Sequence, residues 1–209
     1  MITLVVCTRG SKSFSVLRQS IAAYAADLVT IRPYCTGHST FGDAYNYAMA
    51  DAFQDCSEML IANDDIVLTP TTIQMLLEDV KALKLTTPRL GLVGTWSDNV
   101  RGLQSIKKNP GNQIKRTHTL SPILAWISKR AFTAAQFPPL NWYSDDVLCE
   151  DLTRLGFEHY ISRAYVHHVG SATIGPDDWK NYHDALPWLW DNRPEYATRW
   201  NLKDRGENV

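Results

Sequence analysis

The sequence lacks the features that mark zinc-binding, disulfide-rich or membrane-spanning proteins. Its four cysteines are scattered without a CxxC pair, which argues against a zinc knuckle or a disulfide framework. No apolar run approaches the ~20 residues that span a bilayer, and the amino terminus has no basic region of a signal peptide. We therefore expect a cytoplasmic protein with no transmembrane segment, and three of the cysteines, which lie in or beside apolar runs, are expected to be buried thiols.

An excess of charge of one sign is also missing. The formal net charge is -1, so the whole molecule is not an electrostatic surface for nucleic acid, although local patches are compatible with this value. The sequence contains no internal repeat and no low-complexity tract. A length of 209 residues fits one domain, or one domain with a small appendage.

Apolar runs that fit strands alternate with stretches of helical periodicity. Residues 2–7 form a β-branched and apolar run, which is typical of a strand buried on both faces of a parallel sheet. The order β-α-β-α-β-α-β predicts an α/β fold, a doubly wound, mostly parallel sheet flanked by helices in a single Rossmann-like domain. Strands are expected over 2–7, 28–33, 59–62, 90–95, 122–128 and 158–166, with apolar residues resuming at 66–68. Helices are expected over 13–27, 41–53, 129–136 and 147–155, with a further helix opening at Thr69 and Pro70.

The most informative stretch is Asn63-Asp64-Asp65, which ends a short apolar strand. In open α/β sheets, ligands bind in the crevice at the carboxyl ends of the strands. Carboxylates gathered there suit a hard divalent cation that also contacts phosphate oxygens. Taken alone, the stretch is equally compatible with a solvated acidic turn.

Residues 97–119 lose all periodicity and accumulate basic side chains. Loops of this length are uncommon in compact domains and are often lids or binding loops. A solvated basic loop is the alternative, but the position directly after a strand favours a role near the site. The basic residues are Arg101, Lys107, Lys108, Lys115 and Arg116.

Two further polar clusters follow in the second half of the chain. Asp145-Asp146 precedes a helix that ends at Gly156, and His167-His168 follows the last strand. Carboxylate, imidazole and phosphate oxygens together form a reasonable ligand set for Mn²⁺ or Mg²⁺, although either histidine alone is more often structural. Such a metal would neutralise a departing diphosphate, and a separate Asp would serve as general base.

The carboxyl-terminal part is rich in tryptophan. We divide the chain into a domain over 1–175, which includes the flexible basic loop, and an extension over 176–209. The extension is expected to form one or two short helices packed on the sheet, where it would close the acceptor side or make a subunit contact, with the oligomeric state open. Its tryptophans are Trp179, Trp188, Trp190 and Trp200, and Pro187 and Pro194 interrupt it.

Four motifs in order carry a resemblance to a known family. They are Gly42-Asp-Ala-Tyr-Asn46, MLIANDDIVLTP, DDVLCEDLTRLGF and VHHVGSAT. With them, residues 2 to about 173 resemble a family 2 type glycosyltransferase of the GT-A fold, of a small bacterial or phage type. Each motif is moderately specific, and four in the right order are considerably more so.

The resemblance implies roles for the donor side of the site. Asp65 matches the aspartate that binds the metal, and Asn63 stands where the family often has Asp, near the ribose and the metal. That departure leaves a metal-independent variant open. Asp64 lies between them and is assigned to the nucleotide side. The other implied donor residues are Thr8, Arg9 and Asn46, with His168 or its neighbour His167 as the late metal or diphosphate ligand.

The acidic pair matches the position of the catalytic base of inverting members. The register from Gly156 and Cys149 favours Asp145, with Asp146 as the alternative. The resemblance implies a hexosyltransferase that moves a sugar from a UDP- or GDP-sugar to an acceptor hydroxyl, inverting and assisted by Mn²⁺ or Mg²⁺. The acceptor would be a glycan, a small molecule or a modified nucleic acid.

Three alternatives stay open on the sequence. The basic loop is compatible with a phage-type glycosyltransferase that acts on a modified DNA base. The same Asp and His residues are compatible with a metal-dependent nuclease or phosphatase, which would need no sugar donor. The third alternative is a catalytically silent module that binds nucleotide-sugar.

Overall fold

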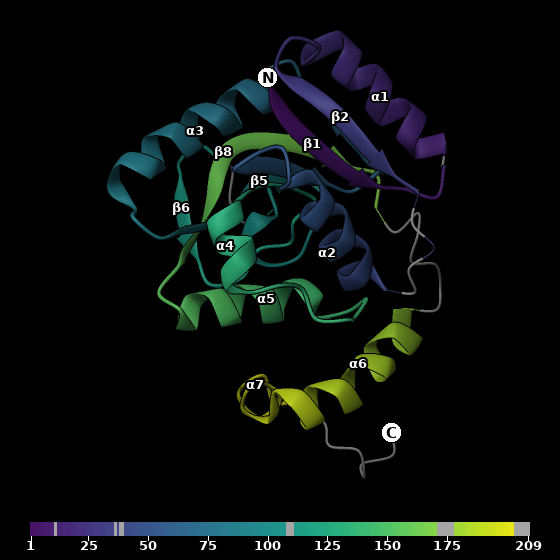
Figure 1. Ribbon diagram of the computed structural model, residues 1–209, viewed down its shortest axis with the longest axis vertical. Coiled ribbons are helices and arrows are strands. Elements are labelled where there is room, and N and C mark those ends of the chain that lie inside the picture. Colours follow the sequence, from purple (N-terminus) through teal and green to yellow (C-terminus); the bar gives the residue numbers. More distant parts are fainter. Residues whose placement is uncertain (11, 36, 38–39, 108–110, 171–177, 203–209) are drawn as a thin grey trace.

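A mixed β-sheet runs through the centre of the molecule with helices on both faces (Figure 1). The computed structural model describes residues 1–10, 12–35, 37, 40–107, 111–170 and 178–202, with only the backbone of 178 and 179. Within this part the strand order is β2-β1-β3-β7-β5-β8-β4, and β6 pairs with β8. The strands are β1 (Ile2–Cys7), β2 (Val29–Tyr34), β3 (Glu58–Ala62), β4 (Ile66–Leu68), β5 (Leu90–Ser97), β6 (Lys115–Thr117), β7 (Leu124–Ser128) and β8 (Glu158–His168).

Five of the eight described strands run in one direction, but only three of their seven pairings are parallel, so the sheet is more mixed than predicted. Strand β1 pairs in parallel with β2 and β3, and β5 pairs in parallel with β8. Strand β7 is antiparallel to both β3 and β5, so β3 and β5 run the same way. Strands β4 and β6 are antiparallel to β8. The carboxyl ends of β1, β3, β5 and β8 therefore open on one edge of the sheet.

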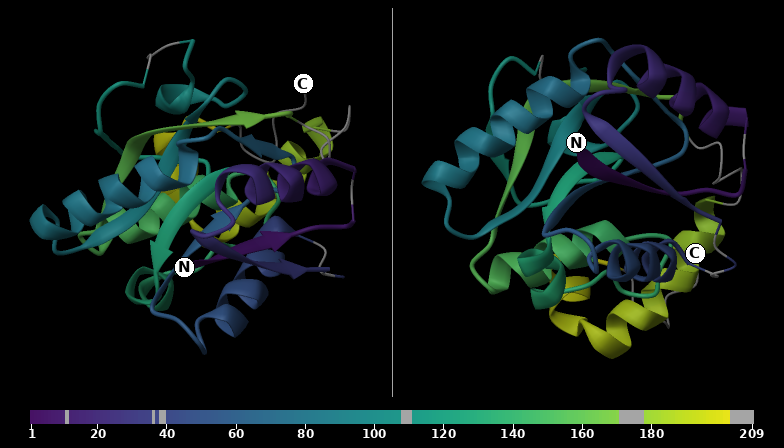
Figure 2. Two further views of the ribbon diagram at one scale, coloured as in Figure 1. Left: turned by 90° about the horizontal axis from the view of Figure 1, so that it is seen from above. Right: turned by 45° about the horizontal axis from the view of Figure 1, so that its top comes forward.

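Two helical layers cover the sheet. Helices α1 and α3 lie on one face and α2, α4 and α5 on the other, as Figure 2 shows from two further directions. Strand β1 illustrates the alternation, because Leu4 and Val6 join the first layer while Val5 joins the second. The helices are α1 (Lys12–Tyr24), α2 (Phe41–Ala52), α3 (Thr72–Thr86), α4 (Lys129–Ala134), α5 (Ser144–Arg154), α6 (Asp178–Asn192) and α7 (Pro194–Arg199).

Helix α3 begins later than predicted. The Thr69 N–H donates to the Thr72 hydroxyl over 2.8 Å, and that hydroxyl donates to the Tyr165 carbonyl of β8 over 2.6 Å. These bonds form a turn over residues 69–71 and place the first helical residue at Thr72. The prediction that Thr69 caps the helix was wrong, because the capping pattern in the sequence does not reveal this bond to a distant strand.

The prediction of a structureless loop over 97–119 was wrong for its described residues, 97–107 and 111–119. Buried Gln104 donates to the carbonyls of Thr95 and Ser121 over 3.0 Å and accepts the Ser121 N–H over 2.7 Å. A short 3₁₀ helix, η1 (Gly102–Gln104), and strand β6 lie within the segment. Lys108 lies outside the described residues.

The carboxyl-terminal helices pack on α5 and not on the sheet, which corrects the prediction (Figure 1). Val147 of α5 forms a buried cluster with Leu189, Tyr196 and Ala197. The sheet was not available because helices already cover both of its faces. The predicted boundary at 175/176 and the Trp179 side chain lie outside the described residues.

The cysteines also differ from prediction. Cys149 is buried, Cys7 and Cys56 are half-buried and Cys35 is exposed. Cys7 is the last residue of β1 and packs at the border of the core cluster under α2, so of the four cysteines only Cys149 is fully enclosed. No helix in the described part of the chain is long and apolar enough to cross a membrane.

The start of α2 is tied to the segment that precedes α5. The Gly42 N–H donates to the Leu140 carbonyl over 3.1 Å, and the Phe41 N–H donates to Asn141 Oδ1 over 2.8 Å. Asn46 donates to the Phe137 carbonyl over 2.8 Å and accepts the Phe137 N–H over 3.1 Å. Two positions of the Gly-x-Ala-x-Asn motif thus hold the loop that leads into the acidic pair.

This contact predicts that Gly42→Ala destabilises the protein. A Cβ at Gly42 would lie 1.8 Å from the Pro138 carbonyl oxygen, which is a backbone atom that cannot turn away. We expect the free energy of unfolding in urea to fall by about 2–3 kcal/mol, although alanine favours helices. Gly37→Ala is the control, because a Cβ there meets nothing within 4 Å. Equal urea midpoints for the two variants would contradict the close contact between Gly42 and the Pro138 carbonyl.

Candidate functional site

Thr8 and Asp64 meet at the point where the sheet reverses its strand order. Strand β1 lies between β2 and β3, and Thr8 and Asp64 follow the carboxyl ends of β1 and β3. The Thr8 hydroxyl donates to Asp64 Oδ2 over 2.7 Å and accepts the Gly10 N–H over 3.0 Å. Both side chains are buried. Two of the predicted nucleotide residues therefore lie together at the topological switch point, where α/β sheets bind ligands.

Asp65 and His168 form the second contact at this edge. Strand β4 is antiparallel to β8, with Ile66 opposite His168, and this register places Asp65 beside the end of β8. The Val169 N–H donates to the Asp65 carbonyl over 2.9 Å. His168 Nε2 lies 3.2 Å from Asp65 Oδ1, and the Asp65 side chain is 6% exposed. The structure thus joins residues that the sequence separates by about a hundred positions.

The contacts of His168 define its tautomer. Its Nδ1 lies 2.7 Å from the Asn99 carbonyl oxygen, which can only accept, so Nδ1 carries a proton. In the neutral ring the Nε2 lone pair then faces the Asp65 carboxylate. Burial lowers the pKa of His168, but the hydrogen bonds to Asp65 and Asn99 outweigh it, and the net pKa is raised. Nε2 and Oδ1 therefore share either a proton or a cation, and a metal-bound histidine commonly donates its other N–H to a carbonyl in this way.

His167 does not share this site. Its side chain is exposed, and its Nδ1 lies 2.5 Å from Asp98 Oδ2. The other oxygen of Asp98 accepts the His168 N–H over 3.1 Å. Burial raises the pKa of Asp98, but these bonds lower it more. Of the two predicted histidines, the structure brings only His168 to Asp65, because successive strand residues face opposite ways.

Asp98 was missed in the sequence. It follows β5 directly, and a polar residue at the carboxyl end of a buried strand was the available signal.

The acidic pair lies in the first turn of α5. Asp145 accepts the Asp146 N–H over 3.1 Å and a hydrogen bond from the Ser121 hydroxyl. The Arg101 guanidinium, whose charge acts on both carboxylates, lies 4.4 Å from the centre of the Trp142 ring. Ser121 was not predicted, and Arg101 was predicted only as part of the basic loop.

Both carboxyl groups titrate above their usual range. Burial raises the pKa of Asp145, with the bonds from Ser121 and the backbone and the charge of Arg101 opposing it. Burial and the charge of Asp145 raise the pKa of Asp146 to about 7, with Arg101 again opposing. Since Asp145 holds the hydrogen bonds that favour the charged form, we assign it as the ionised member and Asp146 as the protonated one.

Three other predicted residues have different surroundings. Both polar atoms of the Asn46 amide bond to the backbone of Phe137, which gives Asn46 a structural contact. Asn63 is half-buried, and its backbone N–H donates to the Ile123 carbonyl over 3.0 Å. Arg9 is exposed at the end of β1. Donor contacts by these residues stay predictions.

The basic residues of the loop are divided between two places. Arg101 reaches the acidic pair, whereas Arg116 of β6 pairs with Glu158 over 3.2 Å. Arg116 lies opposite Tyr160, which is eight positions before His168 on β8 and hence roughly 26 Å from it along the strand. Arg101 and Arg116 therefore do not belong to one patch.

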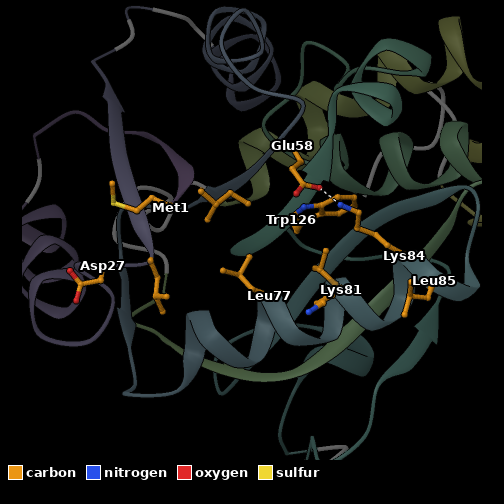
Figure 3. Close-up of a pocket in the computed structure, with 11 residues that line it drawn as sticks. Met1, Asp27, Glu58, Leu77, Lys81, Lys84, Leu85 and Trp126 are labelled. Atoms are coloured by element: carbon orange, nitrogen blue, oxygen red, sulfur yellow. Dashed lines mark hydrogen bonds and ion pairs between the residues drawn. The ribbon is translucent and has the colours of Figure 1, made fainter.

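A cavity of about 490 Å³ lies at the opposite edge of the sheet (Figure 3). Ile2, Leu77 and Val80 contribute to its largely aliphatic wall. Lys84 at its rim is paired with Glu58 over 2.7 Å. None of the predicted site residues lines it, and the polar residues that could perform chemistry converge at the other edge of the sheet.

The edge of the sheet that carries Asp65 and His168 has the chemistry for a divalent cation with few protein ligands. Among the residues that the structure describes, no three His, Cys, Asp or Glu side chains are grouped to hold a metal. Asp65 Oδ1 and His168 Nε2 supply two convergent donors. Mg²⁺ and similar ions are commonly held by one or two protein groups together with substrate phosphates and water, so the residues fit such an ion.

No protein-family model matches the chain, and no curated protein matches it in sequence. Many solved structures resemble it, including the following three. TarS of S. aureus in complex with UDP-GlcNAc is 15% identical, with a TM-score of 0.56, over 90% of this chain and 66% of that chain. The mannosyltransferase PcManGT from Pyrobaculum calidifontis, in complex with GDP-Man and Mn²⁺, is 13% identical, with a TM-score of 0.56, over 88% and 64%. GalNAc-T7 with UDP, GalNAc and Mn²⁺ is 10% identical, with a TM-score of 0.60, over 93% and 50%.

These likenesses show the fold. The chain has the GT-A fold of these proteins, which confirms the predicted fold class. It spans between 50% and 66% of their length. Membership in family 2 stays a prediction.

The raised pKa of Asp146 predicts a pH-dependent stability effect of Asp146→Asn. Between the ordinary aspartate pKa and about 7, the folded state binds more protons than the unfolded state, so this group destabilises the fold as pH rises. We expect Asp146→Asn to raise the free energy of unfolding by about 1–2 kcal/mol at pH 8 and to have little effect at pH 4. Urea denaturation at both values measures it. An equal gain in the free energy of unfolding at pH 4 and pH 8 would contradict the raised pKa of Asp146.

Proposed function

We propose that this GT-A chain is a glycosyltransferase that moves a sugar from a UDP- or GDP-sugar to an acceptor hydroxyl with inversion. The observation that carries the proposal is the contact of Asp65 Oδ1 with His168 Nε2, at 3.2 Å, on the edge of the sheet that also holds Thr8 and Asp64. The solved structures of this fold include complexes with UDP-GlcNAc, with GDP-Man and Mn²⁺, and with UDP, GalNAc and Mn²⁺, which supports a nucleotide-sugar donor.

Asp65 and His168 would hold a divalent metal, Mn²⁺ or Mg²⁺, at the donor diphosphate. When bound, such an ion supplies positive charge that stabilises the leaving nucleoside diphosphate. The Asn99 carbonyl holds the His168 ring with Nε2 toward Asp65. Thr8 and Asp64, and by the family resemblance Arg9, Asn46 and Asn63, are proposed to contact the nucleotide.

The acidic pair would act on the acceptor. The ionised carboxylate of Asp145 takes the proton of the acceptor hydroxyl as the oxygen attacks the anomeric carbon. The new carbon–oxygen bond forms as the bond to the diphosphate oxygen breaks on the opposite face, which inverts the centre. A carboxylate whose pKa is raised by burial is a stronger base than an ordinary aspartate, and so suits this proton transfer.

The other functions considered from the sequence have less support. A hydrolase with a metal cluster needs several grouped carboxylates, and the described residues contain no such group. A DNA acceptor is not specifically favoured, because Arg116 is paired with Glu158 away from the site. We propose a glycan, a small molecule or a modified nucleic acid as acceptor, and a hexose as the transferred sugar.

Ligand-induced stabilisation tests the donor site. Nucleoside diphosphates and nucleotide-sugars are screened by thermal shift with and without Mn²⁺, and a cognate donor at about 100 Kd should stabilise the fold by ~2.7 kcal/mol. Asp65→Asn and His168→Ala should each remove the Mn²⁺-dependent part of the shift. His167→Ala is the matched control and should keep it, because His167 contacts Asp98 and not Asp65. The absence of a thermal shift with every nucleotide tested would contradict the proposal.

Catalysis by the acidic pair is tested separately. Asp145→Asn should lower kcat for release of nucleoside diphosphate by about 10²–10⁴-fold and leave donor binding unchanged. In the wild type, kcat should rise with pH through the apparent pKa of the pair, because the base must be ionised. Unchanged turnover by the Asn variant would rule out this base. Hydrolysis of phosphoesters without a sugar donor would indicate the hydrolase alternative.

A further inference from the structure

Tyr143 has an unusual backbone conformation directly before the acidic pair. Its φ is 63° and its ψ is 4°, in the left-handed region that bulky residues rarely adopt. Its carbonyl accepts the Val147 N–H over 3.0 Å, so Tyr143 starts the helix whose first turn carries Asp145 and Asp146. A change in the backbone angles at Tyr143 would therefore turn both carboxylates relative to Arg101 and Ser121.

Aromatic contacts from the carboxyl-terminal helices hold the Tyr143 ring. The ring stacks on Trp200, with centroids 5.6 Å apart and an interplanar angle of 15°. The ring of Tyr182 lies 6.0 Å away at 48°. Tyr182 belongs to α6, and Trp200 directly follows α7, so two elements remote in sequence enclose this residue. Stacked aromatic pairs stabilise a contact beyond the area they bury.

Charged contacts fasten the same helices to α5. Arg193 bonds to both oxygens of Asp151, over 3.1 and 2.8 Å. The Tyr196 hydroxyl donates to Asp151 over 2.5 Å, and Arg199 pairs with Glu150 over 2.6 Å. Tyr196 is fully buried, and its ring lies 5.5 Å from that of Trp200. The segment that carries Trp200 is thus itself held on α5 by these contacts.

We propose that Tyr143 is a positioning residue for the acidic pair, held in its left-handed conformation by the stack on Trp200. This proposal rests on the proposed transferase function and deepens it, because it makes the carboxyl-terminal helices part of the catalytic apparatus. Without the stack, Tyr143 relaxes to a negative φ and the first turn of α5 shifts. The charged and titratable groups that act on the pair, Arg101, Cys149 and Tyr143 itself, then stand in a different arrangement around the two carboxylates.

Trp200→Ala tests the stack, with Trp188→Ala as the matched control. Trp188 packs against the same apolar cluster, and no ring contact between it and Tyr143 is found among the described residues. We expect Trp200→Ala to lower kcat tenfold or more and to leave the Kd for donor within about twofold, because a small displacement of catalytic groups costs rate and not donor affinity. Trp188→Ala should lower the Tm and keep kcat, and Trp200→Phe should restore most of the rate.

The titration of the acidic pair supplies a readout that needs no activity. The side-chain carboxyl ¹³C shifts are followed against pH in protein without donor. The midpoint should move by about half a pH unit or more in Trp200→Ala and not in Trp188→Ala. If the wild type transfers no sugar, the proposed function fails and this titration still decides the positioning role. Equal losses of kcat in the two alanine variants, or an unmoved midpoint in Trp200→Ala, would overturn the proposal.

Substitution of Tyr143 itself separates its backbone from its ring. Tyr143→Gly and Tyr143→Ala both remove the stack, but only glycine adopts a positive φ at little cost. Tyr143→Gly should therefore keep at least tenfold more activity than Tyr143→Ala, and its acidic pair should titrate closer to the wild-type midpoint. Equal activity and equal midpoints in these variants would mean that the left-handed backbone does not position the pair. This comparison decides the proposal even if Trp200→Ala does not fold.

Discussion

The buried carboxylate of Asp65 is the constraint on which the donor side depends. An unpaired buried charge is costly, so Asp65 needs a partner that can neutralise it. His168 meets this need because β8 continues to its position and runs antiparallel to β4. The Asn99 carbonyl and the Asp98 carboxylate in turn hold His168 through its ring and its backbone. Three segments of the chain are therefore organised around one carboxylate, and the arrangement that neutralises it is also suited to a divalent cation.

The acidic pair follows the opposite electrostatic principle. Arg101 places a guanidinium charge near both carboxylates, and Asp145 also receives hydrogen bonds. Burial nevertheless raises the pKa of Asp145, and burial together with the charge of Asp145 raises the pKa of Asp146. A carboxylate that is fully neutralised by a partner is a poor base, whereas one that is only partly compensated can accept a proton near neutral pH. In the proposed mechanism, this contrast between the two carboxylate clusters separates the residues that bind the donor charge from those that transfer the proton.

The packing around the acidic pair explains why distant segments matter. Gly42 and Asn46 hold the segment that leads into α5, and Tyr143 links it to the carboxyl-terminal helices. Asn46 of the Gly-x-Ala-x-Asn motif was assigned to the donor side on resemblance, and in the structure its amide bonds to Phe137 in the segment before the acidic pair. A residue type that recurs in a family can therefore reflect a packing requirement as well as a ligand contact.

Local patterns in the sequence determined most of the strands and helices and the three polar clusters, because period-two and 3.6-residue patterns record which side of each element is buried. Strand β6 was missed because it lies in a segment without such a pattern. The local patterns also placed Asn63-Asp64-Asp65 and Asp145-Asp146 at the ends of elements.

Only the tertiary structure decided which groups meet. The antiparallel register of β4 and β8 places His168, and not His167, beside Asp65. The hydrogen bonds of Gln104 hold a loop whose sequence has no periodic pattern. The sheet, already covered on both faces, left the carboxyl-terminal helices to pack on α5. Strand direction, register and long-range hydrogen bonds depend on residues far apart in the chain, and for that physical reason the local sequence does not encode them visibly.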